Sequence, residues 1–222
     1  MTETPPVTAA IINYRTPDLV ERAVHAFRRH YATLPLLLID NGSHDESAHM
    51  LENLRDEAPG HTSLLLNDRN LHHGPAMDQA LRRLTSTCIL FIDSDVEIRT
   101  GGVVERMLDV LLAKPEHYAA GMKIFMNKRG FDVPEGTPEA LSYIRPICMV
   151  IRRDLYLTLP RFRRHGTPCL ENFKAAAGRG LMLAHIPVDD YIHHEGRGTA
   201  GRHGYRLGWR GRVNHLLNRL GL

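Results

Sequence analysis

Short apolar runs alternate with amphipathic segments along the first half of the chain. The apolar runs predict strands at residues 7–13, 36–39, 62–66 and 88–92. Between them, apolar residues spaced three and four apart predict a helix beginning at Pro17 and helices over residues 44–55 and 74–84. Strands that alternate with helices in this way favour an open, mostly parallel sheet with helices on both faces, an α/β fold.

The pattern is less regular in the second half. It predicts helices at residues 103–112 and 170–177 and strands at 118–125, 147–151 and 181–186. Residues 126–142 are rich in Gly, Pro and charged side chains, which indicates a loop. We therefore expect one domain over residues 7–195, followed at 196–222 by a flexible, glycine-rich basic loop and a C-terminal amphipathic helix.

Composition narrows the class of protein. The 222 residues are 43% hydrophobic, enough for one well-buried core. No segment approaches the roughly 18 apolar residues of a membrane span, and the N-terminus lacks a secretion pattern. Three cysteines without close spacing predict reduced thiols rather than disulfides or a zinc site. These features predict a cytoplasmic protein.

Charge is unevenly distributed. The formal net charge is only +3, so the whole molecule does not have the charge of a nucleic-acid-binding protein. Residues 196–222, however, contain six arginines and no acidic residue. The helix expected in this segment could pack on the core, form a homodimer contact, or lie on the anionic inner face of a membrane.

The strongest chemical signal is a pair of carboxylates directly after the apolar run at 88–92. Asp93 and Asp95 are two residues apart, a spacing that places both side chains on one face of a strand. Like charges so close repel unless a cation lies between them or one of them is protonated. A divalent cation that holds substrate phosphates would account for both residues. The alternative is a helix N-cap followed by a solvated acid.

Other predicted strands also end in polar residues. Asn13, Asp40 and Asn67 follow three of them. Right-handed crossovers bring such ends to one edge of a parallel sheet, where open α/β sheets bind ligands. The sequence therefore predicts a polar site at this edge, although Asp40 could equally serve as a turn former.

Four segments in this order resemble glycosyltransferase family 2, whose members have the GT-A fold. They are AIINY at residues 10–14, IDNGSHD at 39–45, NLHHGPAMD at 70–78 and DSD at 93–95. Pro187, followed six residues later by His193, resembles the closing segment, in which a histidine can complete the metal site. The resemblance covers residues 7–198.

The resemblance implies a metal-dependent, inverting glycosyltransferase. It would move a sugar from a UDP-, GDP- or TDP-sugar donor to a hydroxyl acceptor in polysaccharide, glycolipid or natural-product glycosylation. Mn²⁺ or Mg²⁺ would bind Asp95, Asp93 and His193, with Asp93 alternatively facing the donor ribose or sugar. The residues expected to contact the donor are Asn13, Tyr14, Asp40, Asn41, His73, Gly74, Asp93, Ser94, Arg197 and Arg202. Asp40 would contact the base and Tyr14 would stack on it.

The general base is the least typical part of the pattern. An inverting transfer needs a carboxylate that takes the proton of the acceptor hydroxyl. The family often places a Glu-Asp pair before a late helix, where this chain has Pro168 and Cys169. We expect Glu171 to be catalytic together with Asp95, and Asp189 and Asp190 are alternatives to Glu171. This departure leaves open a non-catalytic nucleotide-sugar-binding protein.

A second enzyme class also carries Asp-x-Asp after a buried strand. In haloacid-dehalogenase-like phosphatases that strand opens the domain, whereas here a long segment precedes it. Val96 stands where these phosphatases have Thr or Gly. The phosphatase is therefore the alternative enzyme class.

Overall fold

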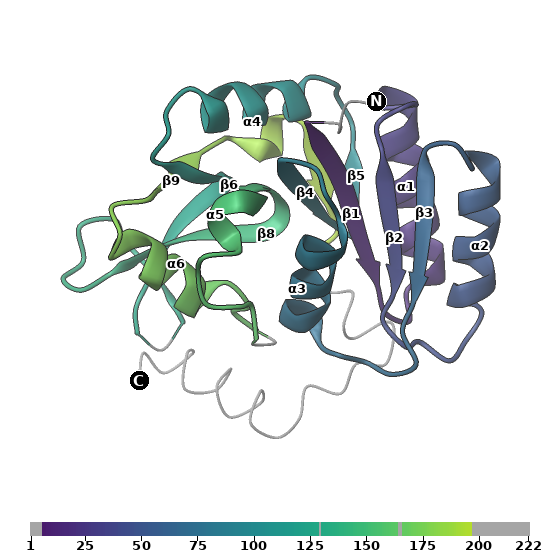
Figure 1. Cartoon of the computed structure of the whole chain (residues 1–222), viewed down its shortest axis with the longest axis horizontal. Coiled ribbons are helices and arrows are strands. Elements are labelled where there is room, and N and C mark those ends of the chain that lie inside the picture. The colour runs from purple at the N-terminus through teal and green to yellow at the C-terminus, as the bar shows by residue number, and fades with distance from the viewer. Residues whose placement is uncertain (1–5, 129, 164–165, 197–222) are drawn as a thin grey trace.

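The computed structural model describes residues 6–128, 130–163 and 166–196 (Figure 1). The main sheet has the strand order β3-β2-β1-β4-β8-β6-β7, with β9 beside β6. Its strands are β1 (Val7–Asn13), β2 (Leu36–Asp40), β3 (Thr62–Leu66), β4 (Cys88–Asp93), β6 (His117–Met126), β7 (Asp132–Val133), β8 (Leu141–Arg152) and β9 (Met182–His185). A second sheet pairs β5 (Val96–Ile98) with β10 (Ile192–His194).

Six α-helices and one 3-10 helix accompany these strands in the described residues. They are α1 (Pro17–His30), α2 (Ser47–Glu57), α3 (His73–Arg83), α4 (Val103–Leu112), α5 (Arg153–Tyr156), α6 (Leu170–Ala177) and η1 (Val188–Asp190). Apolar residues of α1, α2 and α4 pack on one face of the main sheet, and those of α3, α5 and α6 pack on the other. Since neighbouring residues of a strand point to opposite faces, both faces of β1 are buried, which explains its unbroken apolar sequence.

The four strands β3, β2, β1 and β4 are parallel, so their carboxyl ends meet at one edge. The register places Asn13 opposite Asp40 and Ile12 opposite Asp93. Strand β8 runs antiparallel to β4, and β6 antiparallel to β8. The predicted open, mostly parallel α/β sheet with helices on both faces is therefore confirmed.

Several local predictions were incomplete. The short strands β5 and β10 and the four-residue α5 were missed, because each is too short to establish a period. Residues 126–142 contain β7, and β8 begins at Leu141 rather than at 147. Helix α2 begins at Ser47 rather than at 44, because Gly42 and His44 adopt positive φ angles of 75° and 56° that interrupt a helix.

Gly42 permits the loop after β2 to approach the loop after β3. Its φ is 75°, and a Cβ atom there would lie 2.3 Å from the backbone carbonyl carbon of Arg69. We expect Gly42→Ala to lower the free energy of unfolding by about 2–4 kcal/mol, the sum of left-handed strain and a backbone displacement. Urea denaturation measures this change.

Gly60 provides the matched control. No atom lies within 4 Å of the Cβ that alanine would add there, and the φ of Gly60 is outside the left-handed range. Gly60→Ala should change the free energy of unfolding by less than about 0.5 kcal/mol. Equal effects of the two substitutions would contradict the close approach at Gly42.

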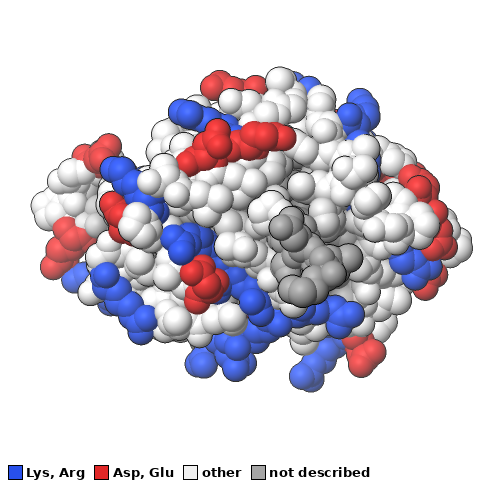
Figure 2. Space-filling model, turned by 45° about the horizontal axis from the view of Figure 1, so that its top comes forward, with Lys and Arg blue, Asp and Glu red and all other residues white. Residues whose placement is uncertain are grey.

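The described surface carries both signs of charge. On the face shown in Figure 2, Lys and Arg side chains gather along the lower border, while Asp and Glu form separate groups.

Within the described residues no helix has the length and apolar character needed to cross a membrane. Gly196 is the last described residue, so Arg197, Arg202 and the predicted C-terminal helix lie outside this part of the chain.

Candidate functional site

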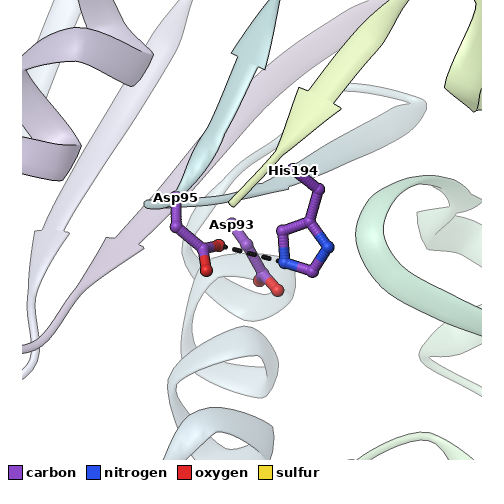
Figure 3. A group of neighbouring side chains, drawn as sticks. All are labelled: Asp93, Asp95 and His194. Atoms are coloured by element: carbon purple, nitrogen blue, oxygen red, sulfur yellow. Dashed lines mark ion pairs between the residues drawn. The ribbon is translucent and has the colours of Figure 1, made fainter. Parts of the chain in front are cut away.

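Two carboxylates and an imidazole converge beyond the end of β4 (Figure 3). Asp93 is the last residue of β4, Asp95 immediately precedes β5, and His194 is the last residue of β10. One ligand atom from each lies within 4.8 Å of the others, and His194 Nε2 is 3.4 Å from Asp95 Oδ1. Two carboxylate oxygens and one imidazole nitrogen form a ligand set suited to a divalent cation such as Mn²⁺.

The geometry corrects the choice of histidine. The sequence prediction named His193 as the third ligand, but the structure places His194 beside Asp95. In the β5–β10 pair, His193 lies opposite Glu97 and His194 opposite Val96. Because adjacent residues of a strand point to opposite faces, only one of the two histidines can face the carboxylates. The six-residue spacing from Pro187 to His193 could not show which histidine faces the carboxylates.

The surroundings of two groups in this site favour their protonated forms. Burial, followed by the charge of Asp95, raises the pKa of Asp93 to about 7. The hydrogen bond to Asp95 raises the pKa of His194 above its ordinary value. A divalent cation would compete with protons for both groups.

We expect the affinity for Mn²⁺ to increase as the pH rises through about 7, the pKa of Asp93. A cation binds the deprotonated carboxylate and the neutral imidazole, so binding releases protons from Asp93 and His194. Titration of Mn²⁺ at several pH values measures the dependence. In Asp93→Asn the step near the pKa of Asp93 should disappear. An affinity that does not change with pH would contradict this assignment.

His73 lies beside the carboxylate group. Its Nε2 is 3.6 Å from Asp93 Oδ1, and this buried nitrogen has no hydrogen-bond partner in the described part of the chain. Burial lowers the pKa of His73 to about 4, so the imidazole is neutral at neutral pH. His73 and the buried Gly74 begin α3 at the edge where β4 ends. Donor contact by both residues stays a prediction.

A buried polar network adjoins this group on the β1–β2 side. Asp40 Oδ1 accepts hydrogen bonds from Asn13 Nδ2 at 3.1 Å and from Ser43 Oγ at 2.5 Å, and Asp40 Oδ2 accepts one from the Ser43 amide at 2.9 Å. Asn13 Oδ1 accepts from Thr16 Oγ1 at 2.8 Å, and Thr16 Oγ1 lies 3.1 Å from Ser94 Oγ. The network joins the ends of β1, β2 and β4. The sequence analysis assigned no role to Ser43, which lies within the IDNGSHD segment, or to Thr16, which lies two residues after AIINY.

Asn41 and Tyr14 differ in their surroundings. Asn41 is buried, accepts from the Leu71 amide at 3.1 Å and donates to Asn70 Oδ1 at 3.1 Å, so it ties the loop after β2 to the segment before α3. Tyr14 is half-buried, with the Arg15 guanidinium carbon 5.4 Å from its ring centroid. Contact of either residue with a donor stays a prediction.

The candidate bases lie on different elements of the fold. Glu171 is exposed in the first turn of α6, two residues after the buried Cys169. Burial raises the pKa of the Cys169 thiol, so this thiol is protonated at neutral pH. Asp189 and Asp190 precede Ile192, which pairs with Ile98 at the end of β5 remote from Asp95. The assignment of Glu171 as the base stays a prediction.

Comparison with known proteins identifies the family. The model of glycosyl transferase family 2 matches residues 8–176, which include every polar residue of the β1–β2 network and both aspartates. The chain belongs to glycosyl transferase family 2.

Solved structures of other transferases share this fold. The family 2 chain is 17% identical, with a TM-score of 0.64, to the mannosyltransferase PcManGT from Pyrobaculum calidifontis in complex with GDP-Man and Mn²⁺. That match covers 84% of this chain and 56% of PcManGT. Glucosyl-3-phosphoglycerate synthase from Mycobacterium tuberculosis, in complex with Mn²⁺, UDP and glucosyl-3-phosphoglycerate, is 16% identical with a TM-score of 0.62, over 98% of this chain and 81% of the synthase. The GT-A fold is thereby confirmed.

One curated relative matches in sequence. The undecaprenyl-phosphate 4-deoxy-4-formamido-L-arabinose transferase of Enterobacter sp. (strain 638) is 31% identical over 81 residues. The match covers 36% of this chain and only 25% of that protein. The family 2 assignment supports a glycosyltransferase and not the haloacid-dehalogenase-like phosphatase that was the alternative.

Proposed function

We propose that this chain is a metal-dependent, inverting glycosyltransferase that uses a nucleotide-diphosphate sugar as donor. The observation that carries the proposal is the convergence of Asp93, Asp95 and His194 at the strand edge beside the buried Asn13–Asp40 pair. A cation site beside a polar, hydrogen-bonded wall suits a donor with a diphosphate at one end and a base at the other.

Asp95, Asp93 and His194 would hold the cation. When bound, a divalent ion supplies Lewis-acid stabilisation of the negative charge that develops on the diphosphate leaving group. The imidazole ligand favours Mn²⁺ over Mg²⁺, because Mg²⁺ prefers an all-oxygen octahedron. The relatives solved with Mn²⁺ and a nucleotide support this choice.

The β1–β2 side would hold the nucleoside. Asp40 is fixed by Asn13 and Ser43, so a base N–H could bind a carboxylate whose position is already set. The half-buried Tyr14 would stack on the base. Neutral His73, close to Asp93, could donate a hydrogen bond to the donor sugar or phosphate without adding charge.

Thermal denaturation with candidate donors tests the proposal. UDP-, GDP- and TDP-sugars should raise the melting temperature in the presence of Mn²⁺ and much less in its absence, because the ion completes the diphosphate site. The nucleotide with the largest shift identifies the donor class. The absence of a shift with every nucleotide would overturn the proposal.

The acceptor would be a hydroxyl compound bound between Glu171 and the donor. A lipid that presents a hydroxyl group at an anionic membrane surface would suit a chain whose residues 196–222 carry six arginines and no acid. Binding to vesicles with and without anionic lipid tests this peripheral membrane contact. Size-exclusion chromatography tests the homodimer that is the alternative use of the same segment.

A further inference from the structure

An ion-pair cluster lies behind the candidate metal centre. Arg22, on α1, reaches two carboxylates, one within a strand of the small sheet and one directly after the other strand. Its Nη2 is 2.5 Å from Glu195 Oε1, and its Nε is 3.4 Å from Glu97 Oε1. Glu97 lies within β5, and Glu195 directly follows β10. Arg22 therefore bridges the two strands that bring His194 to Asp95.

The two faces of this small sheet have different contents. Residues directly opposite each other in an antiparallel pair share a face, so His193 shares the face of Glu97 and His194 points the other way. Glu195 follows His194 and returns to the face of Glu97, where Arg22 contacts both carboxylates. The cluster thus holds β10 from the side opposite the one on which His194 meets Asp95.

The backbone adds one further attachment. The Glu195 amide donates to the Asp95 carbonyl at 3.2 Å, so Glu195 is adjacent to one candidate ligand in sequence and bonded to the other in space. Gly196 follows with a φ of 78°, a left-handed turn conformation that ends the extended backbone of β10. The Arg22–Glu195 pair is therefore the last side-chain attachment before this turn among the described residues.

We propose that Arg22 is a positioning residue that sets the place of His194 in the metal centre through Glu195. This inference rests on the proposed metal role of His194. Residues that orient a metal ligand commonly change metal affinity by about 10- to 100-fold when they are replaced. The Arg22 side chain is 48% exposed, so its replacement should alter global stability little.

Charge alone predicts the opposite result. Removing a positive charge near a cation site should strengthen cation binding, because it removes repulsion. If Arg22 positions His194, Arg22→Gln should instead weaken the binding of Mn²⁺ by about tenfold. Arg22→Lys should restore part of the affinity, since lysine can pair with Glu195 but cannot contact both carboxylates with a planar fork.

The experiment is a titration of the full chain with Mn²⁺, without donor, followed by the electron paramagnetic resonance signal of the free ion. Arg55→Gln is the matched control, because Arg55 is 40% exposed and paired with Asp56 on α2. It removes the same charge and should leave the affinity unchanged. In a Glu195→Gln background, Arg22→Gln should have no further effect, which distinguishes action through Glu195 from a general loss of folding.

Two results would overturn the inference, and they differ. If His194→Ala weakens Mn²⁺ binding but Arg22→Gln leaves it unchanged or strengthens it, the metal centre stands and Arg22 does not position it. If His194→Ala binds Mn²⁺ as the wild type does, both the metal role of His194 and the positioning by Arg22 are wrong.

Discussion

Replacing Asp95 by asparagine is expected to lower donor turnover by about 10³-fold, the rate equivalent of the several kcal/mol that a bound cation contributes to charge stabilisation. Asparagine keeps the size of the side chain but removes the negative charge that, in the proposed site, would hold the cation together with His194. The measurement is kcat/KM for hydrolysis of the donor, since this reaction needs no acceptor. The thermal shift produced by donor with Mn²⁺ should disappear as well.

Asp56→Asn is the control for Asp95→Asn. Asp56 is an acid of α2 that is 63% exposed and forms an ion pair with Arg55. Its replacement therefore changes the net charge by the same amount but lies outside the candidate site. Its turnover should equal that of the wild type. Full turnover in Asp95→Asn would mean that the carboxylate group after β4 does not serve the leaving group.

Glu171→Gln is expected to lower turnover by about 10²- to 10⁴-fold while donor binding stays intact. Glutamine cannot accept the proton of the attacking hydroxyl, and Glu171 is not one of the residues expected to bind the donor or the cation. The paired measurements are kcat for turnover and the thermal shift with donor and Mn²⁺. Only a catalytic role predicts that the first falls while the second remains.

Asp189→Asn and Asp190→Asn are the matched controls for Glu171→Gln. Both acids lie at the end of β10 remote from Asp95, and their replacement should leave turnover unchanged. Normal turnover in Glu171→Gln would show that the base assignment is wrong. Donor binding without turnover in the wild type would instead favour the non-catalytic nucleotide-sugar-binding protein.

The sequence predicted the parallel half of the sheet well, for a physical reason. Strands β1, β2 and β4 are buried on both faces, so each is a nearly unbroken apolar run that is easy to recognise. The antiparallel half was harder to predict. Strand β8 mixes short runs of buried and partly exposed residues over its first half without a period of two, and its pairing with β4 depends on contacts distant in sequence.

The sequence predicted the candidate site residues that lie at the ends of strands. It could not predict those whose position depends on how two strands pair. Asn13, Asp40 and Asp93 end adjacent parallel strands, and the crossover rule was enough to bring them together. The choice between His193 and His194 required the pairing of β10 with β5, two strands of three residues each that no sequence period reveals. The contacts of Arg22 could not be predicted either, since the sequence of an amphipathic helix does not show which carboxylate an arginine will contact.

The most direct test of the account is anomalous diffraction at the manganese edge from crystals grown with Mn²⁺ and the donor nucleotide. The pH should lie above about 7, the pKa of Asp93, so that this carboxylate is ionised. The account predicts an anomalous peak bonded to the Asp95 carboxylate and to His194 Nε2, with the nucleotide diphosphate on its open side. A peak bonded to His193, or no peak beside Asp95, would contradict it.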